Sequence, residues 1–63
     1  MSKQQLMREC DLEHTRLSNM AESAAIRAEV AKDYDHPLSN MWIEKLALYN
    51  SMAEEVLKYK ESL

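Results

Sequence analysis

The chain has 63 residues, and 8 basic against 11 acidic side chains give it a formal net charge of −3. A chain this short forms at most one domain, whose core rarely supplies more than about 3–5 kcal/mol of stability. Its single cysteine, Cys10, excludes an intrachain disulfide, and its dispersed charge disfavours binding to nucleic acid or to anionic membranes. A partner, or further copies of the chain, is the expected additional source of stability.

The composition predicts an all-α fold. The sequence has no glycine and one proline, and residues that favour helices, such as alanine, leucine, glutamate and lysine, dominate it. The β-branched residues from which strands are built are few. No apolar stretch is long enough to span a bilayer, and the first residues lack the apolar block of a signal peptide, so a cytoplasmic location is expected.

A first helix is predicted over about residues 3–33. Ser2 and Gln5 have the spacing of a capping box, which places the helix start near the N-terminus. Apolar residues then recur at steps of three, four and seven, which defines one helix face. The second half of this segment is rich in alanine, and small side chains allow another helix to approach closely. The residues of this face are Leu6, Cys10, Leu17, Met20, Ala24, Ala28 and Ala31.

A loop is predicted over about residues 34–37 and a second helix over about residues 38–61. Pro37 cannot donate a backbone hydrogen bond and disfavours helical geometry at the residue before it. Asp35 is the expected N-cap of the second helix, with Ser39 or Asn40 as the alternative. One apolar stripe of this helix consists of Trp42, Leu46, Tyr49, Ala53, Val56 and Leu63, with Met41, Leu48, Met52 and Tyr59 beside it.

Residues 1–63 are therefore predicted to form a single antiparallel helical hairpin. Each helix carries more apolar surface than one partner helix can cover, for example at Ile26, Val30, Ile43 and Leu57. We expect assembly into a four-helix-bundle dimer or a higher oligomer, with a complex with another protein as the alternative. The predicted oligomer or partner interface consists of Leu17, Ala21, Ala24, Ala28, Ala31, Trp42, Tyr49, Met52 and Val56.

No motif predicts a reaction or a cofactor. Cys10 and His14 are four residues apart on one helix face and could form half of a zinc site. The simpler interpretation, which we adopt, is a buried thiol beside a partly exposed histidine. A helical hairpin has little concave surface to hold a nucleophile, a base and oxyanion donors together. We therefore predict that the protein is not an enzyme and has no metal site.

A small anionic ligand is a second possibility. Trp42, Tyr49 and Tyr59 follow a helical spacing that is more typical of a core than of a ligand platform. In an oligomer, however, such aromatic side chains could stack a nucleotide while cations bind its phosphates. The candidate contacts to such a ligand are Arg16, Arg27, Lys45 and Tyr59.

In length and layout the chain resembles three groups of small helical hairpins. One is the plasmid copy-number regulators that bind RNA, whose stripe of basic and aromatic side chains is missing here. Another is the sporulation-phosphatase hairpins, whose Ser-Gln-Glu-Leu-Asp motif is also missing. The third is the phage hairpins that sequester cyclic nucleotide signals, in which the second helix opens near a Trp like Trp42. The likeness is one of shape and does not assign a family.

The sequence thus predicts a small non-enzymatic interaction protein that self-associates and binds or inhibits another macromolecule. Phages and plasmids commonly encode accessory and anti-defence factors of this size, which makes such a role the expected setting. The alternatives are an oligomeric binder of a small nucleotide signal, with sites between subunits, and an RNA binder similar to the plasmid regulators.

Overall fold

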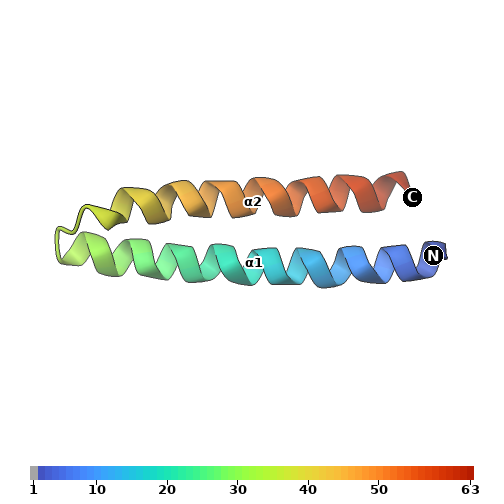
Figure 1. Ribbon diagram of the computed structural model, residues 1–63, viewed down its shortest axis with the longest axis horizontal. Helices are drawn as coiled ribbons and strands as arrows, with labels where there is room; N and C mark the ends of the chain where they lie inside the picture. Colours follow the sequence, from blue (N-terminus) through green and yellow to red (C-terminus); the bar gives the residue numbers. More distant parts are fainter. Residues whose placement is uncertain (1) are drawn as a thin grey trace.

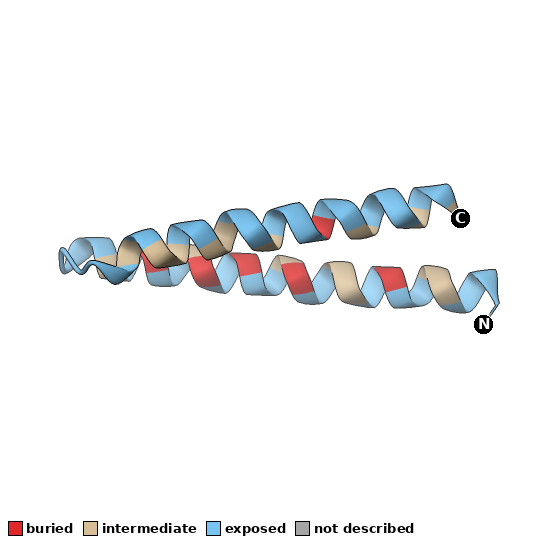
Figure 2. Ribbon diagram, turned by 45° about the horizontal axis from the view of Figure 1, so that its top comes forward, coloured by how far each residue is buried: buried red, intermediate tan, exposed pale blue. Residues whose placement is uncertain are grey.

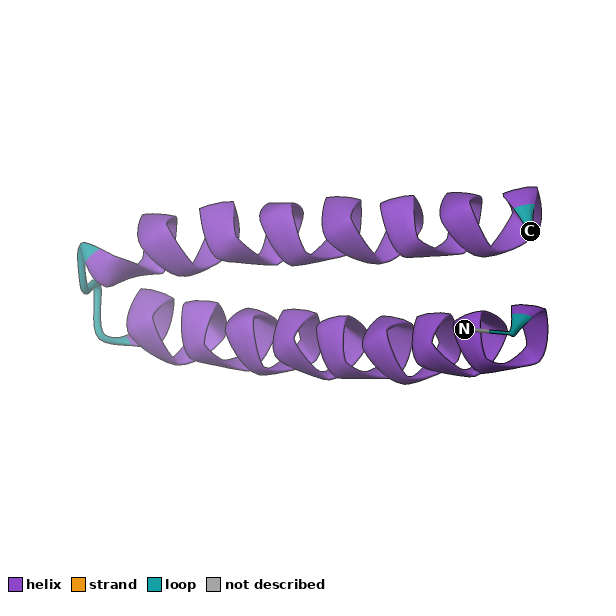
Figure 3. Ribbon diagram, turned by 45° about the vertical axis from the view of Figure 1, so that its right-hand side comes forward, coloured by secondary structure: helices purple, strands orange, loops and turns teal. Residues whose placement is uncertain are grey.

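The computed structural model describes residues 2–63 and consists of two antiparallel α-helices joined by a short loop (Figure 1). Helix α1 spans Lys3–Asp33 and helix α2 spans Leu38–Ser62. The two termini lie at the same end of a rod that measures 48 × 14 × 13 Å, and the loop lies at the other (Figures 1 and 3). The predicted all-α helical hairpin is confirmed. Neither helix of the described chain is both long and apolar enough to cross a membrane.

Helix α1 begins with the predicted capping box. The backbone N–H of Gln5 donates to Oγ of Ser2 over 3.2 Å, and the backbone N–H of Ser2 donates to Oε1 of Gln5 over 3.0 Å. These two hydrogen bonds satisfy N–H groups that have no acceptor within the first turn of a helix. The start of α1 is therefore encoded locally, within four residues of sequence.

Helix α1 ends in a Schellman motif centred on Asp35. The N–H of Asp35 donates to the carbonyl of Lys32 over 2.9 Å, and the N–H of His36 donates to the carbonyl of Ala31 over 2.7 Å. Asp35 has a φ of 54°, the left-handed conformation that this motif requires and that glycine adopts most easily. The chain has no glycine, and aspartate occupies this position instead. Its short polar side chain tolerates the left-handed conformation better than most others do.

The expectation that Asp35 caps α2 was therefore wrong. Its backbone belongs to the end of α1, and Pro37 occupies the N-cap position of α2 without a side-chain hydrogen bond of its own. The N–H of Leu38 instead donates to Nδ1 of His36 over 3.1 Å. The alternative caps, Ser39 and Asn40, lie inside α2. Sequence spacing did not reveal where α2 is capped, because the left-handed backbone at Asp35 changes the direction of the chain before α2 begins.

We expect Asp35→Gly to stabilise the hairpin by about 0.5–1 kcal/mol. Removing the Cβ relieves about 1–2 kcal/mol of left-handed strain, which the greater flexibility of glycine in the unfolded chain partly offsets. The measurement is the urea midpoint at a fixed protein concentration. The matched control is Asp33→Gly, in the last turn of α1, which should lower the midpoint. An Asp35→Gly variant that is destabilised as much as Asp33→Gly would contradict the proposed strain.

The hairpin has a thin core made mostly of small side chains. The buried segments of α1 face α2 along most of the rod (Figure 2). Within residues 2–63, no large side chain is completely buried. A core of this kind removes little apolar surface from water, so it supplies only a small part of the stability that a folded chain needs. The buried residues are Cys10, Leu17, Ala21, Ala24 and Ala28 of α1 and Ala53 of α2.

Two contacts between the helices define their register. Nζ of Lys60 lies 2.6 Å from Oδ1 of Asp11 near the open end of the hairpin, and the guanidinium of Arg27 lies 4.8 Å from the ring centroid of Trp42 near the loop. Trp42 and Tyr49 of α2 are half-buried and lie beside Ala24 of α1. Small side chains on one helix thus accommodate large ones on the other.

Candidate functional site

The most distinctive feature of the surface is its exposed apolar side chains. Isolated exposed apolar residues are ordinary on soluble proteins, but contiguous apolar patches typically mark interaction sites. Here the exposed residues outweigh the buried ones in both number and size. The large apolar residues that are exposed are Leu12, Met20, Ile26, Val30, Tyr34, Leu38, Ile43, Leu48, Met52, Leu57 and Tyr59.

Part of this surface is a regular stripe on α2. The residues Met41, Lys45, Leu48, Met52, Glu55 and Tyr59 follow one another at steps of four and three, the spacing of residues that face a partner helix in a coiled coil. This stripe lies immediately beside the stripe that contacts α1. Leu48 is 55% exposed and Met52 is 42% exposed. The second stripe of α2 therefore has the pattern of a helix–helix contact but no helix covering it within one chain.

Side chains of α1 extend this stripe across the hairpin. Met20 and Arg27 share a groove with Lys45 near the middle of the rod, and Glu9 and Glu13 share another with Glu55 near the open end. We call this combined surface the mixed face. It consists of Glu9, Glu13, Met20 and Arg27 of α1 and of Lys45, Leu48, Met52, Glu55 and Tyr59 of α2.

Two cations of the mixed face converge on Trp42. The guanidinium of Arg27 lies 4.8 Å from the centroid of the indole ring, and Nζ of Lys45 lies 5.8 Å from it. Both distances permit a favourable interaction with the aromatic ring. In the described chain the ion pairs are Arg16–Glu13 and Lys60–Asp11, so neither Arg27 nor Lys45 has a carboxylate partner there. The part of the mixed face between its middle and the loop therefore carries positive charge that no carboxylate of the described chain pairs with.

The open-end part of the mixed face carries negative charge. Glu9, Glu13 and Glu55 line one groove together with Tyr59. Oε2 of Glu13 accepts a hydrogen bond from Nη1 of Arg16 over 3.0 Å, in a pair exposed to solvent. Such an exposed pair contributes about 0–1 kcal/mol and leaves the other two carboxylates unpaired. The two signs of charge on the mixed face are thus separated along its length, with cations toward the loop and carboxylates toward the open end.

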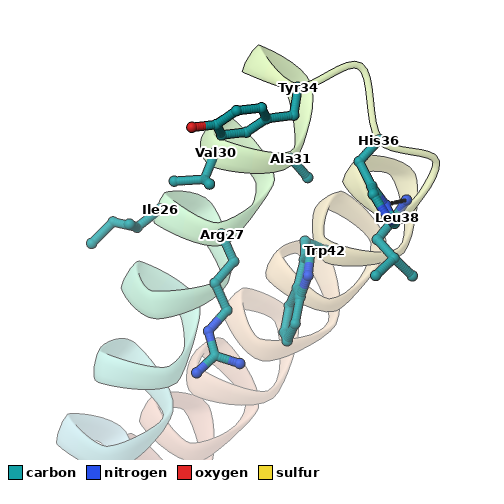
Figure 4. Close-up of a pocket in the computed structure, with 8 residues that line it drawn as sticks. All are labelled: Ile26, Arg27, Val30, Ala31, Tyr34, His36, Leu38 and Trp42. Carbon is teal, nitrogen blue, oxygen red and sulfur yellow. Dashed lines mark hydrogen bonds between the residues drawn. The ribbon is translucent and has the colours of Figure 1, made fainter.

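A third groove lies at the loop end of the hairpin (Figure 4). Arg27 extends from α1 toward the ring of Trp42, whereas Ile26 and Val30 point away from α2. Tyr34 lies above them at the end of α1 and is exposed. This groove is lined mostly by apolar side chains, so it continues the exposed apolar surface around the outer side of α1.

The structure places most of the predicted interface residues between the two helices of one chain. Only Met52 among them is exposed, so contact of the others with a second copy stays a prediction. Met20 and Leu48 were not among the predicted interface residues, although the four–three spacing of the second stripe was a signal for Leu48. Leu17, Ala21, Ala24 and Ala28 are buried, and Ala31, Trp42, Tyr49 and Val56 are half-buried.

Within one chain, the four candidate ligand contacts do not lie together, and a site between subunits stays a prediction. Arg27 and Lys45 meet at Trp42, whereas Arg16 pairs with Glu13. Tyr59 lies beside carboxylates in the groove at the open end. A single chain therefore offers an anion two cations and an aromatic ring, and the other two residues lie elsewhere.

Cys10 and His14 do not gather further metal ligands around them. Cys10 is buried and His14 is half-buried in α1. Over residues 2–63, no group of three or more His, Cys, Asp or Glu side chains is arranged to hold a metal ion.

No protein-family model matches the chain, and it matches neither a curated protein nor a solved structure. Its function must therefore be inferred from the chemistry of its own surface.

Proposed function

We propose that the protein is a small non-enzymatic interaction protein that self-associates through its exposed apolar surface and binds another macromolecule, as an accessory or inhibitory factor. The observation that carries this proposal is the contrast between a thin, alanine-rich core and the large apolar side chains left exposed on both helices. Chains of this size require an additional source of stability, and this chain has one cysteine and therefore no internal disulfide.

Self-association supplies the missing apolar burial. Covering a leucine or methionine side chain completely contributes about 1.5–3 kcal/mol relative to leaving it in water. Met20, Leu48 and Met52 lie together on the mixed face, so a second copy would cover three such residues from each chain. The resulting gain is comparable to the whole stability expected of one hairpin core.

A second apolar region remains available for another macromolecule. Ile26, Val30 and Tyr34 lie on the outer side of α1, away from the contact with α2. Ile43 and Leu57 of α2 are also exposed and lie outside the stripe that contains Leu48. An assembly that covers the mixed face would still present these side chains, which suits a protein that acts by binding a partner.

The test compares the mass in solution of the wild type with that of Leu48→Lys, Met52→Lys. We expect this double variant to raise the dissociation constant of the assembly at least tenfold, because it replaces the apolar centre of the mixed face with charge. The control is Ala47→Lys, Ser51→Lys, which adds the same charge to exposed positions on another side of α2. Equal association of the wild type and Leu48→Lys, Met52→Lys, or a wild type that stays monomeric at every concentration, would contradict the proposal.

A further inference from the structure

The charges of the mixed face are arranged so that it is complementary to itself. Arg27 follows Glu9 by 18 residues, which is five full turns at 3.6 residues per turn, so both side chains leave α1 in the same direction about 27 Å apart. On α2, Lys45 lies on the same stripe as Glu55. Each helix therefore contributes one such pair, with its cation toward the loop and its carboxylate toward the open end.

The two charge pairs share one midpoint. The position halfway between Glu9 and Arg27 is residue 18, and the position halfway between Lys45 and Glu55 is residue 50. The contacts Lys60–Asp11 and Arg27–Trp42 place residue 50 opposite residues 19–21. Both midpoints thus lie at nearly the same height along the rod.

Apolar side chains lie at this common midpoint. Met20 of α1 is close to it in sequence, and the same register brings Leu48 and Met52 of α2 to within about one turn of it. All three are exposed. An apolar centre between charged ends is the usual anatomy of a protein interface.

We propose that two copies of the chain pack with their mixed faces together and their hairpins antiparallel, related by a two-fold axis that lies between the copies, perpendicular to the helices, at the height of residues 18 and 50. This inference rests on the proposed self-association and specifies its geometry. The rotation lays α1 against α1 and α2 against α2. It brings Arg27 opposite Glu9 of the second copy, and Lys45 opposite Glu55, twice in each dimer.

The alternative face-to-face arrangement has a two-fold axis parallel to the helices. That rotation keeps the heights of all residues and lays α1 of one copy over α2 of the other. Arg27 would then face Lys45, and Glu9 and Glu13 would be near Glu55, so these like charges would oppose one another. Electrostatics therefore selects the antiparallel arrangement.

The mixed face is large enough for such an interface. The Cα extents of 48 and 14 Å give the whole side of the hairpin that carries it a flat footprint of about 670 Å², close to the roughly 800 Å² that each partner buries in a standard stable interface, and the mixed face itself, about 27 Å long, forms the centre of that side. A two-fold contact uses the same patch on both copies, so the arrangement closes at the dimer and forms a four-helix bundle.

Charge reversal with rescue tests this geometry. The first variant is Arg27→Glu, Lys45→Glu and the second is Glu9→Lys, Glu55→Lys. Each alone places like charges opposite one another, and we expect the dissociation constant to rise at least tenfold at low salt. An equimolar mixture of the two restores opposite charges at all four contacts, so it should form a mixed dimer with an affinity close to that of the wild type.

Two control variants make the same charge changes away from the mixed face. They are Arg8→Glu, Lys58→Glu and Glu22→Lys, Glu54→Lys, all at exposed positions, and they should dimerise like the wild type. A wild-type dimer whose mixed-face variants stay dimeric, or whose folded variants do not pair when mixed, would overturn the proposed geometry but leave self-association intact. A wild type that is monomeric would instead contradict the proposed function.

If a charge-reversed variant loses its helicity, neutral variants test the antiparallel arrangement instead. Arg27→Gln, Lys45→Gln and Glu9→Gln, Glu55→Gln remove the attraction without adding repulsion. The geometry predicts that each weakens the dimer about three- to tenfold at low salt and much less at 1 M salt, where screening acts within about 3 Å. Neutral variants that dimerise like the wild type at low salt would overturn it.

Discussion

Ala21→Glu is expected to unfold the hairpin under conditions in which the wild type is helical. Ala21 is 5% exposed and is one of the buried alanines of α1, and the buried segments of this helix face α2 (Figure 2). A glutamate there either buries a carboxylate without a partner or pushes the two helices apart, and an uncompensated buried charge costs several kcal/mol. That cost equals or exceeds the stability of about 3–5 kcal/mol expected of such a small core.

The measurement for Ala21→Glu is the far-ultraviolet circular dichroism as a function of urea. The matched control is Ala47→Glu, the same substitution at an exposed position of α2, which should shift the free energy of unfolding by no more than about 0.5 kcal/mol. If Ala21→Glu unfolds at the same urea concentration as Ala47→Glu, the alanine-rich side of α1 is not the contact between the helices.

Leu17→Ala is expected to lower the free energy of unfolding by about 2–5 kcal/mol, the range for truncating a buried leucine. Leu17 is 4% exposed and is the largest of the buried side chains, so no other residue of the core can replace the surface it buries. The loss should appear as a lower urea midpoint at a fixed protein concentration, because association adds to the apparent stability.

Leu12→Ala is the matched control, since it makes the same substitution in the same helix at a side chain that is 56% exposed. Its effect should be much smaller than that of Leu17→Ala. Equal losses for the two variants would mean that Leu12 is covered as fully as Leu17 and that the outer side of α1 also packs against something in solution.

The local features of the fold were predictable from the sequence, because neighbouring residues encode them. Ser2 and Gln5 specify the start of α1 through their own hydrogen bonds, and the apolar periodicity specifies both helices. The role of Asp35 was not predictable, because aspartate is a common N-cap and only the path of the chain shows that it adopts a positive φ. The absence of glycine removed the usual signal for that conformation.

The division of the apolar surface was only partly predictable. Both stripes of α2 have the spacing of helix contacts, the first through Trp42 and Tyr49 and the second through Leu48 and Met52. Periodicity cannot tell which of two such stripes meets the helix of the same chain. The predicted interface therefore combined residues that lie between α1 and α2 with Met52, which is exposed.

The charge pattern of the mixed face depended on the register of the two helices. Arg27 and Lys45 are 18 residues apart in the chain, and only the packing of α2 on α1 brings both to Trp42. The sequence predicted each as a possible anion contact. It could not show that neither has a carboxylate partner within the described chain, or that their counterparts lie an equal distance along the rod.

The most direct test of self-association is the mass of the wild-type protein in solution, measured by light scattering over a concentration series with circular dichroism on the same samples. We predict a dimer, or a larger closed assembly, whose helicity corresponds to helices of 31 and 25 residues and falls as dilution separates the chains. A monomer that keeps this helicity at every concentration would contradict the account, because its thin core would then suffice without a partner.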